Sequence, residues 1–292
     1  MDKKALVNKS IDYILTHLEE PISIEDVANQ LSFSKYYFCR MFKEVTGEGV
    51  YSFIKRLKVE QSAIDLKLQK NKRITDIGLD YGYSASNYSS LFKEHYQLSP
   101  NDYRKSLEAS TISNPFYPQK QEVLDTFEDY QKKVELKELN DLYVVYERML
   151  GNYAELKSSW SALVEENAYY DETTVMIEKF YSDPAVAIDG HSICDLCFML
   201  NEEIKEKNTM VITGGTYAIY PYKGQIEDIF RVMQGFFRIW LPESGYQMRE
   251  KYGLTIYRKI DWENDYVQLD MCIPVESVSY THLRAHETGA YL

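Results

Sequence analysis

Apolar residues in the first third of the chain recur at helical spacing, and the pattern occurs twice with an offset of 50 residues. Phe33–Glu44 reads "FSKYYFCRMFKE" and Tyr83–Glu94 reads "YSASNYSSLFKE". Ser34 and Ser84 are good N-cap residues at the same point of each copy. Each copy is therefore predicted to be a short helix, a tight turn and a longer helix, with buried positions at Phe38, Met41, Phe42 and Val45, and at Tyr88, Leu91 and Phe92.

The opposite face of each longer helix is polar or basic. It carries Tyr36, Cys39, Arg40 and Lys43 in the first copy, and Ser86, Asn87, Ser90 and Lys93 in the second. Small polar and basic side chains on one helix face, preceded by a short helix and a turn, are typical of a helix-turn-helix that reads DNA. These side chains are the predicted DNA contacts.

The segment between the two copies, Val50 to Gln69, has no proline or glycine and keeps its apolar residues at helical spacing. A helix of that length extends roughly 30 Å, because each residue adds about 1.5 Å. One turn of B-DNA is about 34 Å long. The segment is therefore predicted to be a rigid rod that places the two polar helix faces in successive major grooves of double-stranded DNA.

The second half of the chain alternates between strand-like and helix-like patterns. It also repeats, since Tyr143 aligns with Thr216 at an offset of 73 residues and Asp195 aligns with Asp270 at an offset of 75. The repeated unit is a strand, a helix and two strands. Two such units would pair about a pseudo-twofold axis and leave a cleft between them.

The chain is thus predicted to be a multidomain protein. An all-α region with two helix-turn-helix motifs occupies residues 1–108, and an α+β domain built from the two repeats occupies residues 134–276. Residues 109–133 contain two prolines and little periodicity, so they are expected to be a linker.

Charge is divided unevenly between the two halves. The 292 residues have a formal net charge of −12, but residues 1–105 hold 16 basic and 14 acidic side chains, a net charge of +2. The remainder holds 17 basic and 31 acidic side chains, a net charge of −14. Residues 35–73 alone hold 10 basic and 4 acidic side chains, a net charge of +6. The basic zone therefore surrounds the repeated helices, as a DNA-binding region requires.

Several other classes of protein do not fit this sequence. No apolar run reaches the roughly 18 residues of a membrane span, and the N-terminus lacks a signal-peptide core, so a cytoplasmic protein without a membrane partner is expected. The cysteines are too few and scattered for a disulfide framework. Cys194 and Cys197 form a CxxC, but positions i and i+3 of a strand point to opposite faces. No metal, cofactor or catalytic residue is predicted.

The first hundred residues resemble the AraC/XylS family of transcription regulators over Leu6 to Ser106, including "GYS" at Gly82–Ser84 and "LSPNDYR" at Leu98–Arg104. The resemblance implies base reading through Tyr36, Cys39 and Arg40, although Cys39 stands where the family often has Gln. It also implies RNA polymerase as a partner. Ser90 stands where the family often has Arg, so the second helix is expected to read bases weakly or to hold mainly phosphate.

The second half resembles the gyrase-inhibitor-like (GyrI-like) effector-binding domain. The segments that carry the resemblance are "LGNY", "YSDP", "TGGTYA", "WLPESGY" and "MCIPV", between Leu150 and Val275. The resemblance implies a sensor of small, often cationic and lipophilic molecules, with Asp270 facing the ligand. Strand alternation places Asp270 on the face opposite Leu269 and Met271. Aromatic walls are expected from Tyr153, Trp160, Trp240 and Tyr246, because ring faces attract cations.

Two other functions remain open at this stage. One is an enzyme that hydrolyses reactive small molecules, since some GyrI-like proteins do so, with Asp270 and Tyr246 as candidates. The other is a protein-binding module whose acidic second half docks a basic partner. The regulator is the leading hypothesis, because no nucleophile and base are visibly paired in the sequence.

The end of the chain has a different character. "VSYTHLRAHET", from Val278 to Thr288, continues neither a strand nor a helix pattern and resembles the translation of a transposon-based sequencing adapter. Residues 277–292 are therefore expected to be adapter-derived and are left out of functional reasoning.

Overall fold

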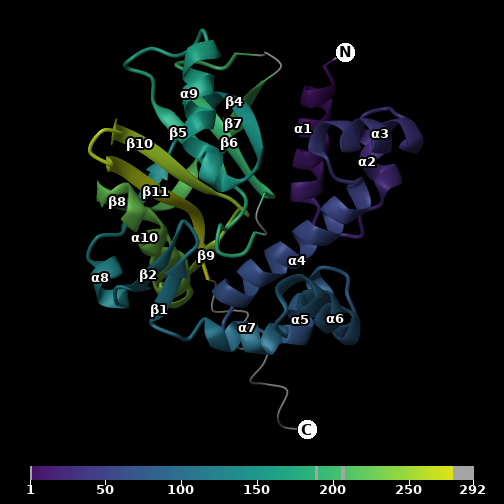
Figure 1. Cartoon of the computed structure of the whole chain (residues 1–292), viewed down its shortest axis with the longest axis horizontal. Coiled ribbons are helices and arrows are strands. Elements are labelled where there is room, and N and C mark those ends of the chain that lie inside the picture. Colours follow the sequence, from purple (N-terminus) through teal and green to yellow (C-terminus); the bar gives the residue numbers. More distant parts are fainter. Residues whose placement is uncertain (1, 188–189, 205–207, 279–292) are drawn as a thin grey trace.

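The computed structural model describes residues 2–187, 190–204 and 208–278. Its first part is helical, as predicted (Figure 1). The helices are α1 (Lys3–Thr16), α2 (Ile24–Gln30), α3 (Lys35–Thr46), α4 (Val50–Leu68), α5 (Ile74–Asp80), α6 (Ala85–Tyr96) and α7 (Pro100–Ser106). The sequence prediction of two helix pairs joined by one long helix is confirmed.

The two helix-turn-helix motifs share their local geometry, because equivalent residues cap the longer helix and form the turn in each. The Ser34 and Ser84 side chains accept hydrogen bonds from backbone N–H groups in the first turns of α3 and α6. The tight turns before them use Ser32 and Gly82, with φ of 57° and 79°. The left-handed conformation is natural for Gly82 and is tolerated at Ser32.

The long helix α4 is the centre of the helical part. Phe42 of α3 packs edge-on against Phe53 of α4, with ring centroids 5.1 Å apart. In the second copy of the motif, the Tyr88 hydroxyl of α6 donates to Ser62 Oγ of α4 at 3.0 Å. Each longer helix of a motif is therefore fixed directly to the rod.

The stretch expected to be a linker has regular structure. It forms a hairpin of β1 (Thr111–Asn114) and β2 (Tyr117–Val123), followed by α8 (Phe127–Gln131). The turn follows from Asn114, whose side-chain oxygen accepts a hydrogen bond from the Phe116 N–H at 2.9 Å. Lys120 ties the hairpin to Glu227 at 2.9 Å. Because these strands are short and largely polar, their sequence carries little alternation, and a loop was expected instead.

The second half is an α+β domain with one antiparallel sheet in the described residues, in the order β3-β8-β11-β10-β5-β6-β4-β7, with β9 paired to β11. The bounds are β3 (Glu135–Leu139), β4 (Leu142–Gly151), β5 (Met176–Phe180), β6 (Ser192–Met199), β7 (Thr209–Ile212), β8 (Gly215–Gln225), β9 (Tyr246–Met248), β10 (Gly253–Asp261) and β11 (Tyr266–Ser277).

The sheet contains the predicted repeat. The strands β5-β6-β4 lie in the same relative order as β10-β11-β8, and β5 pairs with β10 at the junction. Each unit contributes one main helix, α9 (Leu156–Glu166) or α10 (Ile229–Gly235), and α10 continues through a π-helical turn, Phe236–Trp240, into α11 (Leu241–Glu243). Clusters of buried side chains from these helices cover one face of the sheet. The predicted unit of strand, helix, strand and strand is confirmed.

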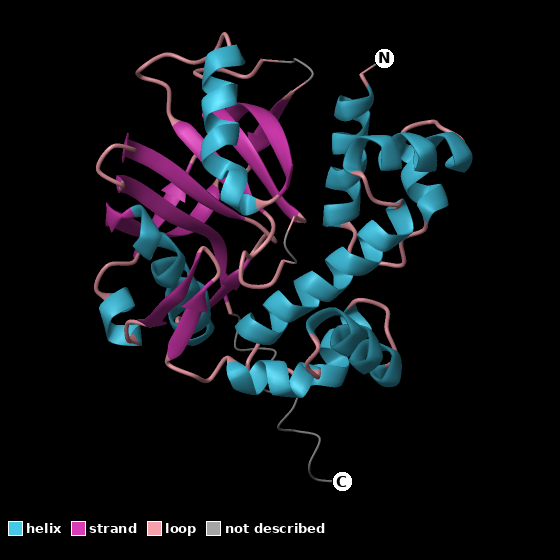
Figure 2. Ribbon diagram, in the orientation of Figure 1, coloured by secondary structure: helices cyan, strands magenta, loops and turns pink. Residues whose placement is uncertain are grey.

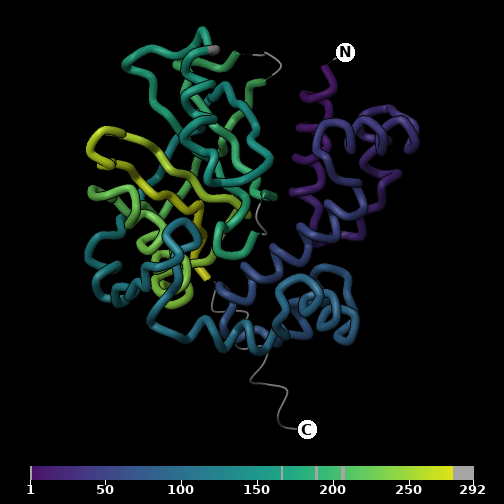
Figure 3. Tube along the Cα trace, viewed as in Figure 1, coloured from purple at the N-terminus to yellow at the C-terminus, as the bar shows by residue number. Residues whose placement is uncertain are grey.

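The helical part packs against the α+β domain along α1 and α4. Figure 2 shows α4 running between the sheet and the longer helices of the two motifs, α3 and α6. Figure 3 shows the two halves of the trace side by side along α4. Arg148 of β4 is fully buried and pairs with Asp195 of β6 at 2.7 Å. The same guanidinium reaches α1, where it donates to the Asn8 carbonyl and to Asp12.

Among the residues that the structure describes, no helix has both the length and the apolar character needed to cross a bilayer. The adapter-like segment lies outside the described residues from position 279 onward, and Ser277 still pairs with Tyr246 in the sheet.

Candidate functional site

The predicted reading face of the first motif is open to solvent. Tyr36 is 80% exposed, and Arg40 and Lys43 are also exposed, whereas Cys39 is half-buried. The Arg40 guanidinium lies 5.7 Å from the ring centre of Tyr37. This face of α3 can therefore present a phenol, a guanidinium and an ammonium group to a DNA groove and its phosphates.

The predicted face of the second motif is equally open but less charged. Ser86, Asn87, Ser90 and Lys93 are all exposed on α6. The Ser90 hydroxyl donates to the Ser86 carbonyl at 3.0 Å within the helix. Its oxygen can still accept a hydrogen bond, but the hydroxyl proton is already used. Lys93 is the cation of this face.

A large cavity lies on the helix-covered side of the sheet. It encloses about 650 Å³ and extends between the start of α10, the β1–β2 turn and the junction of the two repeats. Its walls are mainly apolar and aromatic, and the residues used below are Phe116, Tyr153, Glu178, Phe230, Tyr257 and Leu269. We call it the Glu178 cavity.

Glu178 is the buried acid of this cavity, and its residue is 1% exposed. The Tyr153 hydroxyl donates to one carboxylate oxygen and the Tyr257 hydroxyl donates to the other at 3.1 Å. Burial raises the pKa of Glu178 to about 7, although hydrogen bonds from the two phenols favour the charged form. The pKa values of Tyr153 and Tyr257 are raised well above their ordinary value, chiefly by burial.

The register of the sheet explains the position of this acid. Glu178 of β5 lies opposite Thr255 of β10, at the junction of the two repeats. Tyr257 follows two residues later on β10 and pairs with Leu269 of β11, so both point to the same face as Glu178. The repeat thus brings an acid, a phenol and apolar side chains from three neighbouring strands to one wall.

The structure places only one of the predicted ligand residues in this cavity. Tyr153 lines it and contacts Glu178. Trp160 is buried against Phe198 with ring centroids 6.0 Å apart, so it belongs to the core. Trp240 is also buried, and its indole N–H donates to Gln131 at 2.8 Å.

The other two predicted ligand residues lie elsewhere. Tyr246 lines a different cavity, between the domain and α4. Asp270 is on the face opposite Leu269, as strand alternation predicted, but the Glu178 cavity opens on the Leu269 side. The Asp270 carboxylate pairs with Arg258 at 2.8 Å instead. Asp270 therefore does not line the Glu178 cavity.

Sequence reasoning missed Glu178, and a signal for it was present. In "VMIEKF" the acid shares a strand face with Met176 and Phe180, two residues away on either side. A single carboxylate on an otherwise apolar strand face needs a special partner, because an isolated charge there is costly. Phe116 and Phe230 carried no comparable signal, since their place in the wall depends on the fold of the hairpin and α10.

In the described part of the chain, no cluster of three or more His, Cys, Asp or Glu side chains has a metal-binding arrangement. Cys194 and Cys197 are buried free thiols on strand β6. Burial raises the pKa values of both thiols well above the ordinary value. Such thiols are poor ligands and poor nucleophiles.

The comparisons with known proteins agree with this division of the chain. Residues 27–106 match the family described as a helix-turn-helix domain, and residues 132–276 match the GyrI-like small molecule binding domain. The chain is 31% identical to the regulatory protein SoxS of Salmonella typhimurium over 108 residues, which are 37% of this chain and 100% of SoxS. The aligned stretch is about as long as the helical half.

Two further relatives match a similar share of the chain. Transcriptional regulator Rob of Salmonella typhimurium is 32% identical over 113 residues, which are 38% of this chain but only 39% of Rob. The C-terminal domain of AraT, a response regulator from Geobacillus stearothermophilus, is 29% identical with a TM-score of 0.33, over 35% of this chain and 84% of that structure. The chain belongs to the AraC family of helix-turn-helix transcription regulators, and its second half is a GyrI-like small-molecule binding domain.

Proposed function

We propose that this protein is a transcription regulator that reads DNA through α3 and α6 and senses a lipophilic cation in the Glu178 cavity. The observation that carries the proposal is the buried carboxylate of Glu178 in an aromatic cavity, in a chain that also presents two equivalent exposed helix faces. Its family is one of regulators and not of enzymes. Action in the cytoplasm, together with RNA polymerase, stays a prediction.

The cation follows from the chemistry of the cavity. An ionised carboxylate in an apolar setting is costly, and a cation in the same cavity offsets that cost. The faces of Tyr153, Tyr257 and Phe230 offer further attraction to a positive charge. Because both Glu178 oxygens already accept phenol hydrogen bonds, the cation needs no N–H group of its own. Glu178 takes the place that Asp270 held in the sequence interpretation.

The ligand proposal is tested by calorimetry on the full chain with tetraphenylphosphonium and with triphenylphosphine oxide, a neutral aromatic compound of similar shape. Glu178→Gln keeps the shape of the side chain but removes its charge. It should weaken binding of the cation by roughly 3 kcal/mol, the attraction between two unit charges about 5–6 Å apart at an effective dielectric constant of about 20. Asp270→Asn is the matched control and should leave binding unchanged. Equal affinity of the unaltered protein for the two compounds would remove the basis for a cation sensor.

The DNA proposal is tested on an operator obtained by in vitro selection. Arg40→Ala should lose about 1–3 kcal/mol on the selected site and little on random DNA, if the guanidinium reads a base edge. Lys43→Ala, one helical turn away, should weaken binding to both DNAs alike and lower the salt dependence. A loss of equal size on specific and random DNA for Arg40→Ala would show that Arg40 contacts only the backbone.

A further inference from the structure

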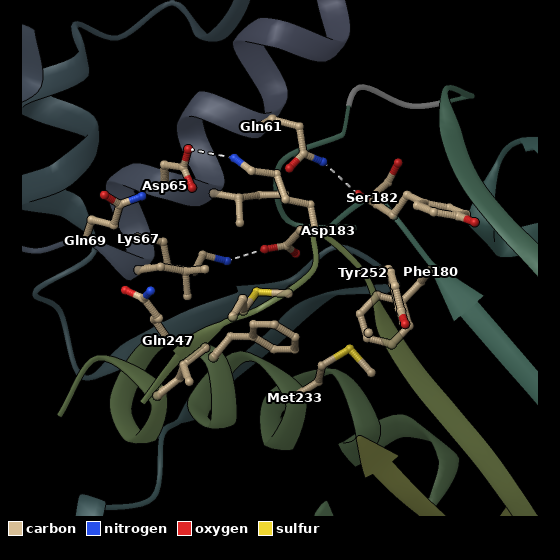
Figure 4. Close-up of a pocket in the computed structure, with 18 of the residues that line it drawn as sticks. Gln61, Asp65, Lys67, Gln69, Phe180, Ser182, Asp183, Met233, Gln247 and Tyr252 are labelled. Atoms are coloured by element: carbon tan, nitrogen blue, oxygen red, sulfur yellow. Dashed lines mark hydrogen bonds and ion pairs between the residues drawn. The ribbon is translucent and has the colours of Figure 1, made fainter. Parts of the chain in front are cut away.

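A second cavity lies between α4 and the α+β domain, and Figure 4 shows its lining. It encloses about 410 Å³. One wall comes from the last turns of α4 and includes Gln61, Asp65 and Lys67. The facing wall includes Asp183, after β5, and Met233 of α10. We call it the interdomain cavity, because its walls come from both halves of the chain.

Three polar side chains at this cavity bond one another in a closed cluster. The Lys67 ammonium group donates to Asp183 and, at 2.8 Å, to the Gln234 side-chain oxygen. The Gln234 amide N–H donates to the other Asp183 oxygen at 2.8 Å. The Lys67 side chain is 1% exposed and that of Asp183 is 15% exposed. A buried lysine is thus neutralised by an acid from the other half of the chain.

The two α+β members of this cluster are the direct neighbours of residues that line the Glu178 cavity. Asp183 precedes Pro184, and Gln234 follows Met233. Pro184 and Met233 line both the Glu178 cavity and the interdomain cavity. A molecule that fills the Glu178 cavity would therefore contact Pro184 and Met233, the chain neighbours of Asp183 and Gln234.

The same segment holds α4 at a second point. The Gln61 amide donates to the Tyr181 carbonyl at 2.9 Å, two residues before Asp183. The next residue of α4, Ser62, accepts a hydrogen bond from the Tyr88 hydroxyl of α6. Since α4 also carries α3, a change at Tyr181–Pro184 acts on the helix that sets the distance between the two recognition helices. A buried ion pair depends steeply on its geometry, because water does not screen it.

We propose that Asp183 couples occupancy of the Glu178 cavity to DNA binding, through its contacts with Lys67 and Gln234. The proposal rests on the proposed function, because it takes the Glu178 cavity as the effector site. Coupling of this kind is reciprocal: if a cation changes affinity for DNA, DNA changes affinity for the cation by the same factor. Cation binding and DNA binding would both change the geometry of the cluster of Lys67, Asp183 and Gln234.

The test measures affinity for the selected operator by fluorescence anisotropy at fixed salt, with and without saturating tetraphenylphosphonium. The unaltered chain should show a change of about fivefold or more, the lower end of typical allosteric coupling. Asp183→Asn should bind the cation almost as before and show no change in DNA affinity upon cation binding. Glu243→Gln is the matched control, because Glu243 forms an exposed ion pair with Lys70, just beyond the C-terminal end of α4. It should keep the full coupling.

Two additions keep the proposal open to refutation. Because Asp183→Asn leaves Lys67 buried without its acid, the double variant Lys67→Met and Asp183→Asn removes both charges and should also lose the coupling. Hydrogen exchange of the α10 amides, measured with and without operator, needs no cation. Operator should alter exchange at Met233–Gly235 in the unaltered chain and not in Asp183→Asn.

These readouts separate the two proposals. Absence of cation binding would end the cation-sensor function, and the exchange measurement would still decide whether Asp183 couples the two parts. Full coupling in a folded Asp183→Asn or double variant would overturn the role of Asp183. So would α10 exchange in the unaltered chain that does not respond to operator.

Discussion

Lowering the pH from 8 to 6 should weaken cation binding about tenfold, because the counter-charge of the cavity becomes protonated. Burial raises the pKa of Glu178 to about 7, so the carboxyl group is about nine-tenths ionised at pH 8 and about one-tenth ionised at pH 6. Tyr153 and Tyr257 contact it directly, and their raised pKa values keep both phenols neutral across this range. Glu178 is thus the group that changes charge.

The assay is titration calorimetry of tetraphenylphosphonium at pH 6, 7 and 8, in two buffers with different heats of ionisation. If only the ionised acid binds the cation, binding at pH 7 should release about half a proton, and the observed enthalpy should shift between buffers accordingly. Glu178→Gln should bind weakly with no pH dependence. The reasoning is refuted if the unaltered protein binds equally well at pH 6 and 8, or if the glutamine variant keeps the dependence on pH.

The same shift sets the sign of the pH dependence of folding. The pKa of Glu178 is higher in the folded chain, about 7, than its ordinary value of 4.5, so the folded state holds the proton more tightly between those values. Stability from this group is complete below about pH 4.5 and is lost as the pH rises to about 7, by at most about 3 kcal/mol. A bound cation should restore much of this loss, so thermal shifts on adding cation should be larger at pH 8 than at pH 6.

Two further predictions concern the stability of the fold. Gly78→Ala should destabilise the second helix-turn-helix by about 1–3 kcal/mol in urea unfolding, because its Cβ would lie 2.8 Å from the buried Tyr88 ring. Gly49→Ala, with open space at its Cβ, should cost much less, and equal losses for the two variants would contradict this reasoning. Arg148→Met should cost about 3–5 kcal/mol, because Asp195 would be left buried without its cation, and a loss below about 1 kcal/mol would show that the pair contributes little.

The helical half was predictable because its signals are local. Ser34 and Ser84 cap the recognition helices as the sequence indicates, and the apolar spacing of each copy gives the buried face directly. The turns repeat at the same offset of 50 residues, because Ser32 and Gly82 occupy equivalent positions and both have left-handed φ angles. Because each of these features depends on neighbours within about four residues in the chain, no tertiary information was needed to find them.

The residues of the proposed ligand cavity were harder to predict, because they depend on which face of the sheet is hollow. Strand alternation correctly put Asp270 and Leu269 on opposite faces, but it does not say which face opens into a cavity. That choice comes from the spacing of the helices above the sheet and from the hairpin that closes one end. Glu178 was reachable from sequence only through its unusual apolar neighbours, Met176 and Phe180.

The interdomain contacts explain a feature of α4 that periodicity alone does not. A rod with one apolar stripe is expected to expose its polar face to water. In the structure α4 is instead buried nearly all round, with charged residues Arg56, Lys58, Glu60, Asp65 and Lys67 among the buried ones. Several of these groups find partners in the other half of the chain, as Lys67 does with Asp183 and Asp65 does with Lys251. Burying such charges is costly unless each is paired, so separating the halves would leave some of them unpaired unless water replaces the lost partners. The helix that spaces the two proposed DNA-reading faces is therefore stabilised by the α+β domain. This contact would give a change in that domain a physical route to bound DNA.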